Sequence, residues 1–269
     1  MNPSPPPPPP RDPDLLEEAL GLGRGGSPPW RLAFVEDCVE TSGAFVLHHF
    51  LKRALSTEGD GTVVFLGLAQ PFSHYDRVLR KMGCNLSVQR NKNKLHFIDL
   101  LNLEFLGEQK LSNEKGENDR EIGFMDLYNR ILRSIEAIRS KDNNGGWTTI
   151  IIDDLSHLEI AAHGSVKHVL DFLQYCRSLT SEMDCFLVIL NHEDIHSSDE
   201  ALQMLSHLDY ISDILIKAET LSTGIAADVH GQMTVVIKDA PGGLIKKLHS
   251  FQFKVKENGV EFFYPGSRF

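Results

Sequence analysis

The chain has 269 residues, 41% of them hydrophobic, which is enough for one domain with a large buried core. Its formal net charge of -10 excludes a protein that coats nucleic acid through bulk electrostatics, so any contact with RNA or DNA has to be local. The four cysteines lack metal-type spacing, and no apolar run approaches the roughly 20 residues of a membrane span. We therefore expect a soluble intracellular protein with reduced cysteines.

The first 29 residues differ in composition from the rest. They combine a proline run, a short acidic segment and a Gly/Pro-rich stretch, a composition that buries too little apolar surface to order itself. We predict a disordered tail over 1–29 and a single domain over 30–269.

Apolar strands and amphipathic helices alternate from residue 31. The strands are continuous apolar runs, as in a parallel sheet that helices cover on both faces. In chain order we predict strand 31–39, helix 42–55, strand 62–69, helix 73–82, strand 95–101, a mobile polar loop 107–120, helix 122–139, strand 148–153, helix 165–179, strand 185–190 and a short helix 199–206.

The pattern changes from residue 210. Shorter strands are expected over 211–217, 232–238, 249–256 and 260–264, joined by glycine-containing turns of which Asn258-Gly259 is the strongest hairpin signal. The predicted fold class is therefore α/β, with a RecA-like core of the P-loop NTPase type, a mainly parallel central sheet and an antiparallel C-terminal edge.

The strand 148–153 ends on two adjacent carboxylates, Asp153 and Asp154, which is how a P-loop nucleotidase places the acid that holds magnesium. The matching phosphate loop, G-x-x-x-x-G-K-[ST], is missing: residues 40–49 contain one glycine and no lysine. Without a Walker A motif we predict no nucleotide site, no metal and no cofactor. Asp153 and Asp154 are then a degenerate Walker B-like pair that orders the turn 155–164 through hydrogen bonds, and metal binding is the alternative.

Residues His192 to His196 spell the H-E-x-x-H pattern of zinc proteases. That chemistry needs both histidines on one face of a helix, whereas this string directly follows a predicted strand that Asn191 is expected to end. We expect it to lie in a loop without zinc. Since no nucleophile elbow and no activated cysteine are found either, no catalytic residue is predicted.

A basic segment stands out against the acidic chain. One interpretation is an ordinary solvated face. The alternative is an RNA-contacting surface, if subunits assemble in a ring and the positive electrostatic potentials of their basic segments add up. The candidate RNA-binding residues are Arg77, Arg80, Lys81, Arg90, Lys92 and Lys94. Weaker candidates of the same kind are Arg24, Arg31 and the pairs Lys246-Lys247 and Lys254-Lys256.

Several strings are more specific than any of these motifs. They are GAFVLHHFL (43–51), QPFSHY (70–75), DDLS (153–156), VLDFLQYCR (169–177), LSTG (221–224) and DVHGQ (228–232). In this order they closely resemble the family of sixth subunits of the Elongator complex, over residues 31 to 264.

The resemblance implies a RecA-like, non-catalytic subunit in a heterohexameric ring with the fourth and fifth Elongator subunits, two copies of each. It also implies contact with the catalytic Elongator core and with tRNA through the ring, in support of the carboxymethyl-type modification of wobble uridines. The expected location is the cytoplasm, with the nucleus as a second compartment. Two alternatives stay open: a divergent ATPase that uses Asp153, and a RecA-like recombination partner that binds DNA.

Overall fold

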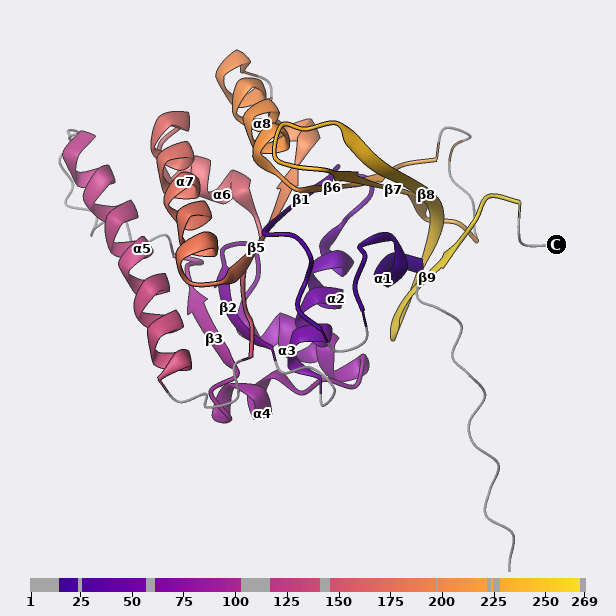
Figure 1. Cartoon of the computed structure of the whole chain (residues 1–269), viewed down its shortest axis with the longest axis horizontal. Coiled ribbons are helices and arrows are strands. Elements are labelled where there is room, and N and C mark those ends of the chain that lie inside the picture. The colour runs from indigo at the N-terminus through magenta and orange to yellow at the C-terminus, as the bar shows by residue number, and fades with distance from the viewer. Residues whose placement is uncertain are drawn as a thin grey trace, which may run out of the picture.

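The computed structural model describes residues 15–23, 26–56, 61–102, 117–140, 146–196, 198–221, 224 and 228–266, and for 117–120 the helical backbone alone. Within these residues the fold is a single twisted sheet with helices on both faces (Figure 1). No described helix combines the length and the apolar character that crossing a membrane requires.

The sheet has nine strands in the order β3-β2-β4-β5-β1-β6-β7-β8-β9. The five pairs from β3 to β6 are parallel, and β7, β8 and β9 extend the sheet as antiparallel strands. The strand bounds are β1 Leu32–Asp37, β2 Thr62–Gly67, β3 Leu95–Asp99, β4 Thr148–Ile152, β5 Cys185–His192, β6 Ile214–Glu219, β7 Gly231–Lys238, β8 Ile245–Lys256 and β9 Gly259–Phe263. The predicted parallel core with an antiparallel edge is confirmed.

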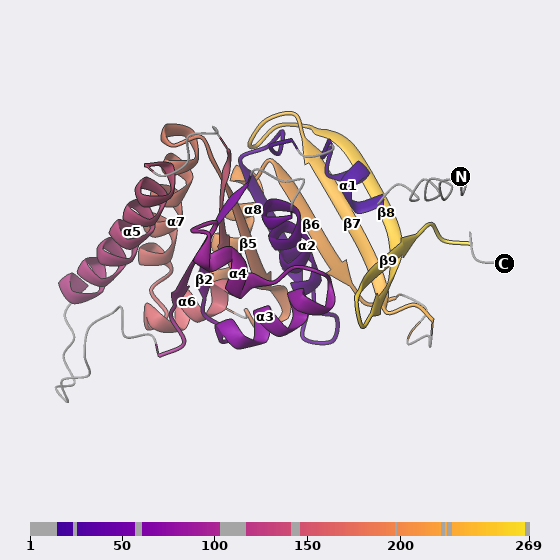
Figure 2. The same cartoon turned by 90° about the horizontal axis from the view of Figure 1, so that it is seen from below.

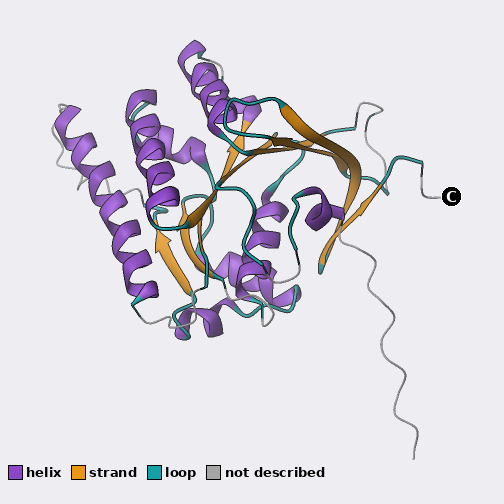
Figure 3. Ribbon diagram, in the orientation of Figure 1, coloured by secondary structure: helices purple, strands orange, loops and turns teal. Residues whose placement is uncertain are grey.

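The helices form two layers, one on each face of the sheet (Figures 2 and 3). One face carries α1 Leu15–Ala19, α2 Ala44–Leu55, α3 Phe72–Lys81 and α4 Leu86–Asn91. The other carries α5 Glu117–Arg139, α6 Leu155–Ala161, α7 Val166–Glu182 and α8 Asp199–Ile211. A 3₁₀ helix, Glu193–Ile195, joins β5 to the segment before α8.

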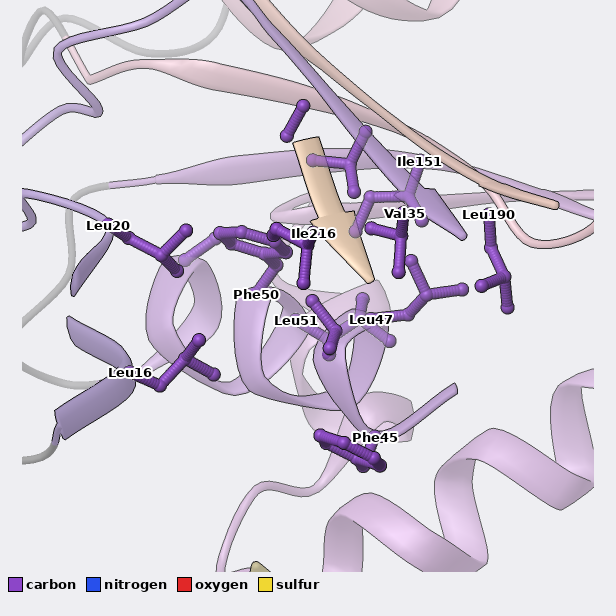
Figure 4. Packing of buried hydrophobic residues seen from close by; sticks show 14 of the residues in the cluster. Leu16, Leu20, Val35, Phe45, Leu47, Phe50, Leu51, Ile151, Leu190 and Ile216 are labelled. Atoms are coloured by element: carbon purple, nitrogen blue, oxygen red, sulfur yellow. The ribbon is translucent and has the colours of Figure 1, made fainter. Parts of the chain in front are cut away.

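Two hydrophobic clusters, one per face, hold the layers together. Every residue of β1, β2 and β4 is buried, as expected for strands covered on both faces. Under α2, the side chains of Leu47 and Leu51 point at Val35 and Ile216 of the sheet (Figure 4). Each such fully buried side chain contributes roughly 1.5–3 kcal/mol through removal of apolar surface from water.

The prediction of a disordered tail is wrong for residues 15–23. Residues 1–14 lie outside the described residues, but α1 follows directly, with Leu16 and Leu20 fully buried in the cluster that contains Phe50. The composition of residues 1–29, averaged over the proline run, hides this short apolar helix. Trp30 closes the contact, because its indole N–H donates to the Leu20 carbonyl at 3.3 Å.

The predicted and observed elements differ at other places too, because helix caps and strand pairing, which hydrophobic periodicity does not reveal, set where elements begin and end. Two helices were not predicted: α4, whose N-cap Asn85 accepts from the Val88 N–H at 3.1 Å, and α6, which replaces the expected turn 155–164. The helix α5 begins at Glu117, inside the expected loop, of which 107–116 lie outside the described residues. The strand β5 continues through Asn191 because β1 pairs with it to its end.

Candidate functional site: an ion network at the strand ends

The carboxyl ends of β1, β4 and β5 meet at one edge of the sheet, the place where open α/β sheets hold their ligands. Asp37 is the last residue of β1, and its register partner is His192, the last residue of β5. Asp153 and Asp154 follow β4, which pairs with β5 in parallel. The parallel topology therefore brings four titratable side chains from three strands to the same edge.

His192 lies between two of these carboxylates. Its Nδ1 atom is hydrogen-bonded to Asp37 Oδ1, and its Nε2 atom lies 3.4 Å from Asp154 Oδ2. Asp154 Oδ2 also contacts His157 Nδ1 at 2.7 Å, and Asp154 Oδ1 accepts from the Ser156 N–H at 2.9 Å. Asp154 thus caps α6 and belongs to the charged network at the same time.

The network favours the charged forms of Asp154, His192 and His157. Burial acts to raise the pKa of Asp154, but hydrogen bonds from His157, His192 and Ser156 outweigh it and hold that pKa well below its usual range. The bond to Asp154, together with the bond to Asp37, raises the pKa of His192 to about 10. The bond to Asp154 also raises the pKa of His157. At neutral pH His192 is therefore a cation held by two carboxylates and not a free base.

The carboxylate of Asp37 also fills the N-terminus of α2. It is fully buried, and its Oδ2 atom accepts from the Gly43 N–H at 2.5 Å. In a P-loop protein the backbone N–H groups at this helix start cradle phosphate. Here the loop between β1 and α2 closes as a tight turn, with the Thr41 N–H bonded to the Cys38 carbonyl at 2.9 Å. The chain's own carboxylate therefore accepts from a backbone N–H at the start of α2.

Asp153 points away from this network, toward β2 and α3. Its Oδ1 atom accepts from the Leu68 N–H at 2.7 Å, and its Oδ2 atom accepts from the Tyr75 hydroxyl at 2.6 Å. Burial raises the pKa of Asp153 to about 6, although the bonds from Tyr75, Leu68 and Ala69 act to lower it. Burial and the nearby Asp153 charge also raise the pKa of the Tyr75 phenol. Asp153 thus ties the end of β2 to α3, and both its oxygens are occupied.

A second ion pair lies beside the network, between β1 and β6. Lys217 Nζ is 2.7 Å from Glu36 Oε2 and 3.8 Å from Glu193 Oε2. Burial raises the pKa of Glu36, with Lys217 acting against that rise. Burial acts to lower the pKa of Lys217, but the bond to Glu36 outweighs it, and the pKa is raised.

The zinc-protease-like string does not have the geometry of a zinc-protease site. His192 ends a strand, and Glu193–Ile195 form a 3₁₀ turn, so the two histidines are not on one face of an α-helix. His196 bonds Asn191 Oδ1 at 2.8 Å and Glu159 Oε2 at 2.9 Å, away from His192. The described part of the chain holds no group of three or more His, Cys, Asp or Glu side chains with the geometry to ligate a metal ion. The prediction that Asn191 ends the strand was wrong.

The predicted basic segment lies on α3, α4 and the turn after α4. Arg77, Arg80, Lys81, Arg90 and Lys92 are exposed, and Lys94 is half-buried. Three of these cations have partners within the chain: Arg80 with Asp76 at 2.6 Å, Lys81 with Glu257 at 2.7 Å, and Arg90 over the ring of Phe72, 5.3 Å from its centroid. Arg77 and Lys92 form no ion pair with another described residue. The contact of this segment with RNA stays a prediction.

Two hollows on the described surface lie away from the ion network. One, of about 130 Å³, lies between α5 and α7. The other, of about 230 Å³, lies between α2, α3 and the β8–β9 turn, with apolar walls from Phe45, Val78 and Met82. His48 lines the second hollow, and burial lowers the pKa of this histidine to about 4, so it is neutral at physiological pH.

Sequence reasoning missed Asp37 and the cationic role of the half-buried His192 in the network, and it missed Tyr75, which bonds Asp153. The position of Asp37, a carboxylate at the end of the first apolar strand, was a usable signal by the same rule that singled out Asp153. Nothing in the local sequence pairs His192 with Asp37, because 155 residues separate them.

Comparison of the sequence with known proteins identifies a family. A model of the family described as Elongation complex protein 6 matches residues 16–257. The Elongator complex protein 6 of Xenopus laevis is 32% identical, with 84% of this chain and 87% of that protein covered. The protein of the same name from Mus musculus is 31% identical, with 84% of this chain and 88% of that protein covered.

Among solved structures, a KaiC-like protein from Pyrococcus horikoshii aligns with a TM-score of 0.57 over 92% of this chain and 94% of that one. At 13% sequence identity this similarity shows the fold alone, and it confirms the expected RecA-like class. The family model covers most of the chain, including every strand except β9, and the relatives match along most of their own length. The chain therefore belongs to the Elongator complex protein 6 family.

Proposed function

We propose that this chain is a non-catalytic RecA-like subunit of the Elongator complex that supports tRNA wobble-uridine modification through assembly of the complex and tRNA binding. Its proposed neighbours are the fourth and fifth Elongator subunits in a heterohexameric ring with two copies of each. The cytoplasm is the proposed site of action, with the nucleus as a second location.

One observation carries the non-catalytic part of the proposal. The N-terminus of α2 is occupied by the Asp37 carboxylate at 2.5 Å from the Gly43 N–H, and that carboxylate is itself bound to His192. A nucleotide phosphate at this position would meet a buried like charge in place of free N–H donors. The family membership supports the link to a multi-subunit complex, and a multi-subunit context explains why a RecA-like fold persists without its phosphate loop.

The test uses cells in which the gene for this chain is deleted and then replaced by variants. Deletion should remove the wobble-uridine side chain, and Asp153→Asn should leave it nearly intact, because no phosphate loop exists for that acid to serve. Phe172→Asp places a charge in the core, where this side chain is 1% exposed, and should mimic deletion through lost assembly. The readout is mass spectrometry of tRNA nucleosides together with purification of the assembled complex.

Loss of modification in Asp153→Asn with the complex still assembled would mean that Asp153 is catalytic. Isothermal titration calorimetry of the purified chain separates the same alternatives. A micromolar, magnesium-dependent affinity for ATP that Asp153→Ala abolishes would favour a divergent ATPase. Retention of the purified chain on single-stranded DNA, with no preference for tRNA, would favour a DNA-binding recombination partner.

A further inference from the structure

The turn between β7 and β8 exposes an unusual set of apolar side chains. We call residues 239–248 the hairpin tip; every one of them is solvent-exposed. Leu244, Ile245 and Leu248 are 81%, 64% and 62% exposed, respectively. Single exposed aliphatic residues are common, but several neighbouring ones mark an interaction surface.

The hairpin tip is fixed to the body of the protein. The Gly242 N–H donates to the Tyr210 carbonyl at 2.6 Å, at the end of α8 (Figure 1). A Cβ atom at Gly242 would lie 2.3 Å from the Tyr210 ring, so this approach requires glycine. At the base of the hairpin, Lys238 Nζ binds Asp209 Oδ1 at 2.7 Å. A surface held in this way loses little conformational entropy on binding.

The helices do not cover this end of the sheet. Along β8 the exposed fraction falls from 64% at Ile245 to 1% at Phe251, where the cluster under α2 begins. The hairpin tip thus lies outside both hydrophobic clusters, and its three aliphatic side chains stay largely exposed. Tyr210, 61% exposed at the foot of the hairpin, adds an aromatic side chain to the same surface.

The charges of the hairpin tip indicate which kind of partner surface would bind it. Lys246 and Lys247 lie between the aliphatic residues of the tip, and neither forms an ion pair with any residue that the structure describes. The tip contains one acid, Asp239, and the whole chain carries a formal net charge of -10. The tip is thus a locally cationic, apolar surface on an acidic protein, and its complement is an apolar pocket with carboxylates at its rim.

We propose that the hairpin tip docks a different protein subunit through such a carboxylate-rimmed apolar pocket. This rests on the proposed function, because it names the surface by which the chain meets a ring neighbour. A two-fold contact between copies would place like lysines together, and the acidic chain is repelled by anionic membranes. RNA phosphates would pair with the lysines but leave the aliphatic side chains uncovered.

The experiment co-expresses the full chain with the fourth and fifth Elongator subunits and measures complex formation by size-exclusion chromatography and affinity by biolayer interferometry. Ile245→Asp should lower the affinity at least about tenfold. The matched control is Ile122→Asp on α5, because Ile122 is 65% exposed, and it should leave the affinity unchanged. Circular dichroism of each isolated variant checks folding, and Leu248→Gln replaces Ile245→Asp if that variant unfolds.

A second arm tests the carboxylate rim. Lys246→Gln with Lys247→Gln should make association less sensitive to salt, since two charge pairs are lost. An unchanged affinity in Ile245→Asp or Leu248→Gln, or an unchanged salt dependence in the lysine variant, would overturn the docking proposal. If the lysine variant assembles normally but its complex no longer binds tRNA, the docking proposal is also overturned, and the hairpin tip contacts RNA instead. If the unmodified chain forms no complex with these subunits, the proposed function fails instead.

Discussion

At the carboxyl ends of β1, β4 and β5, the imidazole of His192 lies between two carboxylates. His192 satisfies two buried acids, Asp37 and Asp154, that would otherwise repel each other across the sheet edge. Such a network is costly when it is broken, because removing one partner leaves a buried charge without compensation. The site therefore acts as a structural clamp between three strands.

The clamp predicts a pH dependence of stability. The pKa of His192 is about 10 in the folded chain, above its ordinary value of 6.5. A raised pKa means that the clamp stabilises fully below about pH 6.5 and is lost as the pH rises through about 10. In urea titrations, the free energy of unfolding should therefore fall from pH 6.5 to pH 10, and His192→Gln should reduce that slope. Equal slopes in both proteins would contradict the clamp.

Tyr75 offers a test of the bond to Asp153. Tyr75→Phe removes a hydroxyl that donates to Asp153 Oδ2 at 2.6 Å and should lower the free energy of unfolding by about 1.5–3 kcal/mol. Because this bond also lowers the pKa of Asp153, that pKa should rise further above about 6. Carbon-13 NMR titration of Asp153 measures the shift. Tyr128→Phe, whose ring packs on Tyr175 at the surface, is the control, and equal stability of the two variants would show that the bond does not form in solution.

Among the elements, α1 changes the description of the domain most. It has only five residues, too short for a stable isolated helix, so it exists through tertiary packing. Its buried side chains belong to the hydrophobic cluster between α2 and the face of the sheet that α2 covers.

The packing of α1 leads to a stability prediction. Leu16→Ala should lower the free energy of unfolding by about 2–5 kcal/mol, because the side chain is fully buried and alanine keeps the helix propensity. Glu18→Ala, at an exposed position of the same helix, should change it by less than about 0.5 kcal/mol. Thermal and urea unfolding of both variants provide the measurement. Equal effects would mean that α1 is not docked in solution.

Across the whole molecule, the basic patch on α3 and α4 contrasts with the acidic chain. Its cations differ in availability, since Arg80 and Lys81 already neutralise Asp76 and Glu257, whereas Arg77 and Lys92 have no ion pair with a described residue. If the patch meets tRNA in the assembled ring, the second pair should contribute more to binding.

This difference predicts the salt dependence of tRNA binding by the ring. Arg77→Gln with Lys92→Gln should reduce the slope of log affinity against log salt by about 0.7–0.9 per lost phosphate contact. Arg80→Gln with Lys81→Gln should reduce it less, because these charges are partly compensated. Filter binding at several salt concentrations measures both. Slopes equal to that of the unmodified ring would identify the patch as a solvated face.

The sequence by itself determined the order and type of most elements, the antiparallel C-terminal edge, the absence of a phosphate loop and the family resemblance. These properties are local: apolar runs mark buried strands, Asn258-Gly259 marks a hairpin, and a missing lysine is visible in one short segment. Asp153 and Asp154 were found for the same reason, because two acids follow one strand.

Only the tertiary structure decided what those acids do and what stands at the start of α2. His192 and Asp37 meet because β1 and β5, far apart in the chain, are neighbours in the sheet. The docking of α1 and the exposure of the hairpin tip likewise depend on which surfaces the helices cover, and periodicity within one segment carries no record of that. Burial and long-range pairing set these features, and both arise only when the whole chain folds.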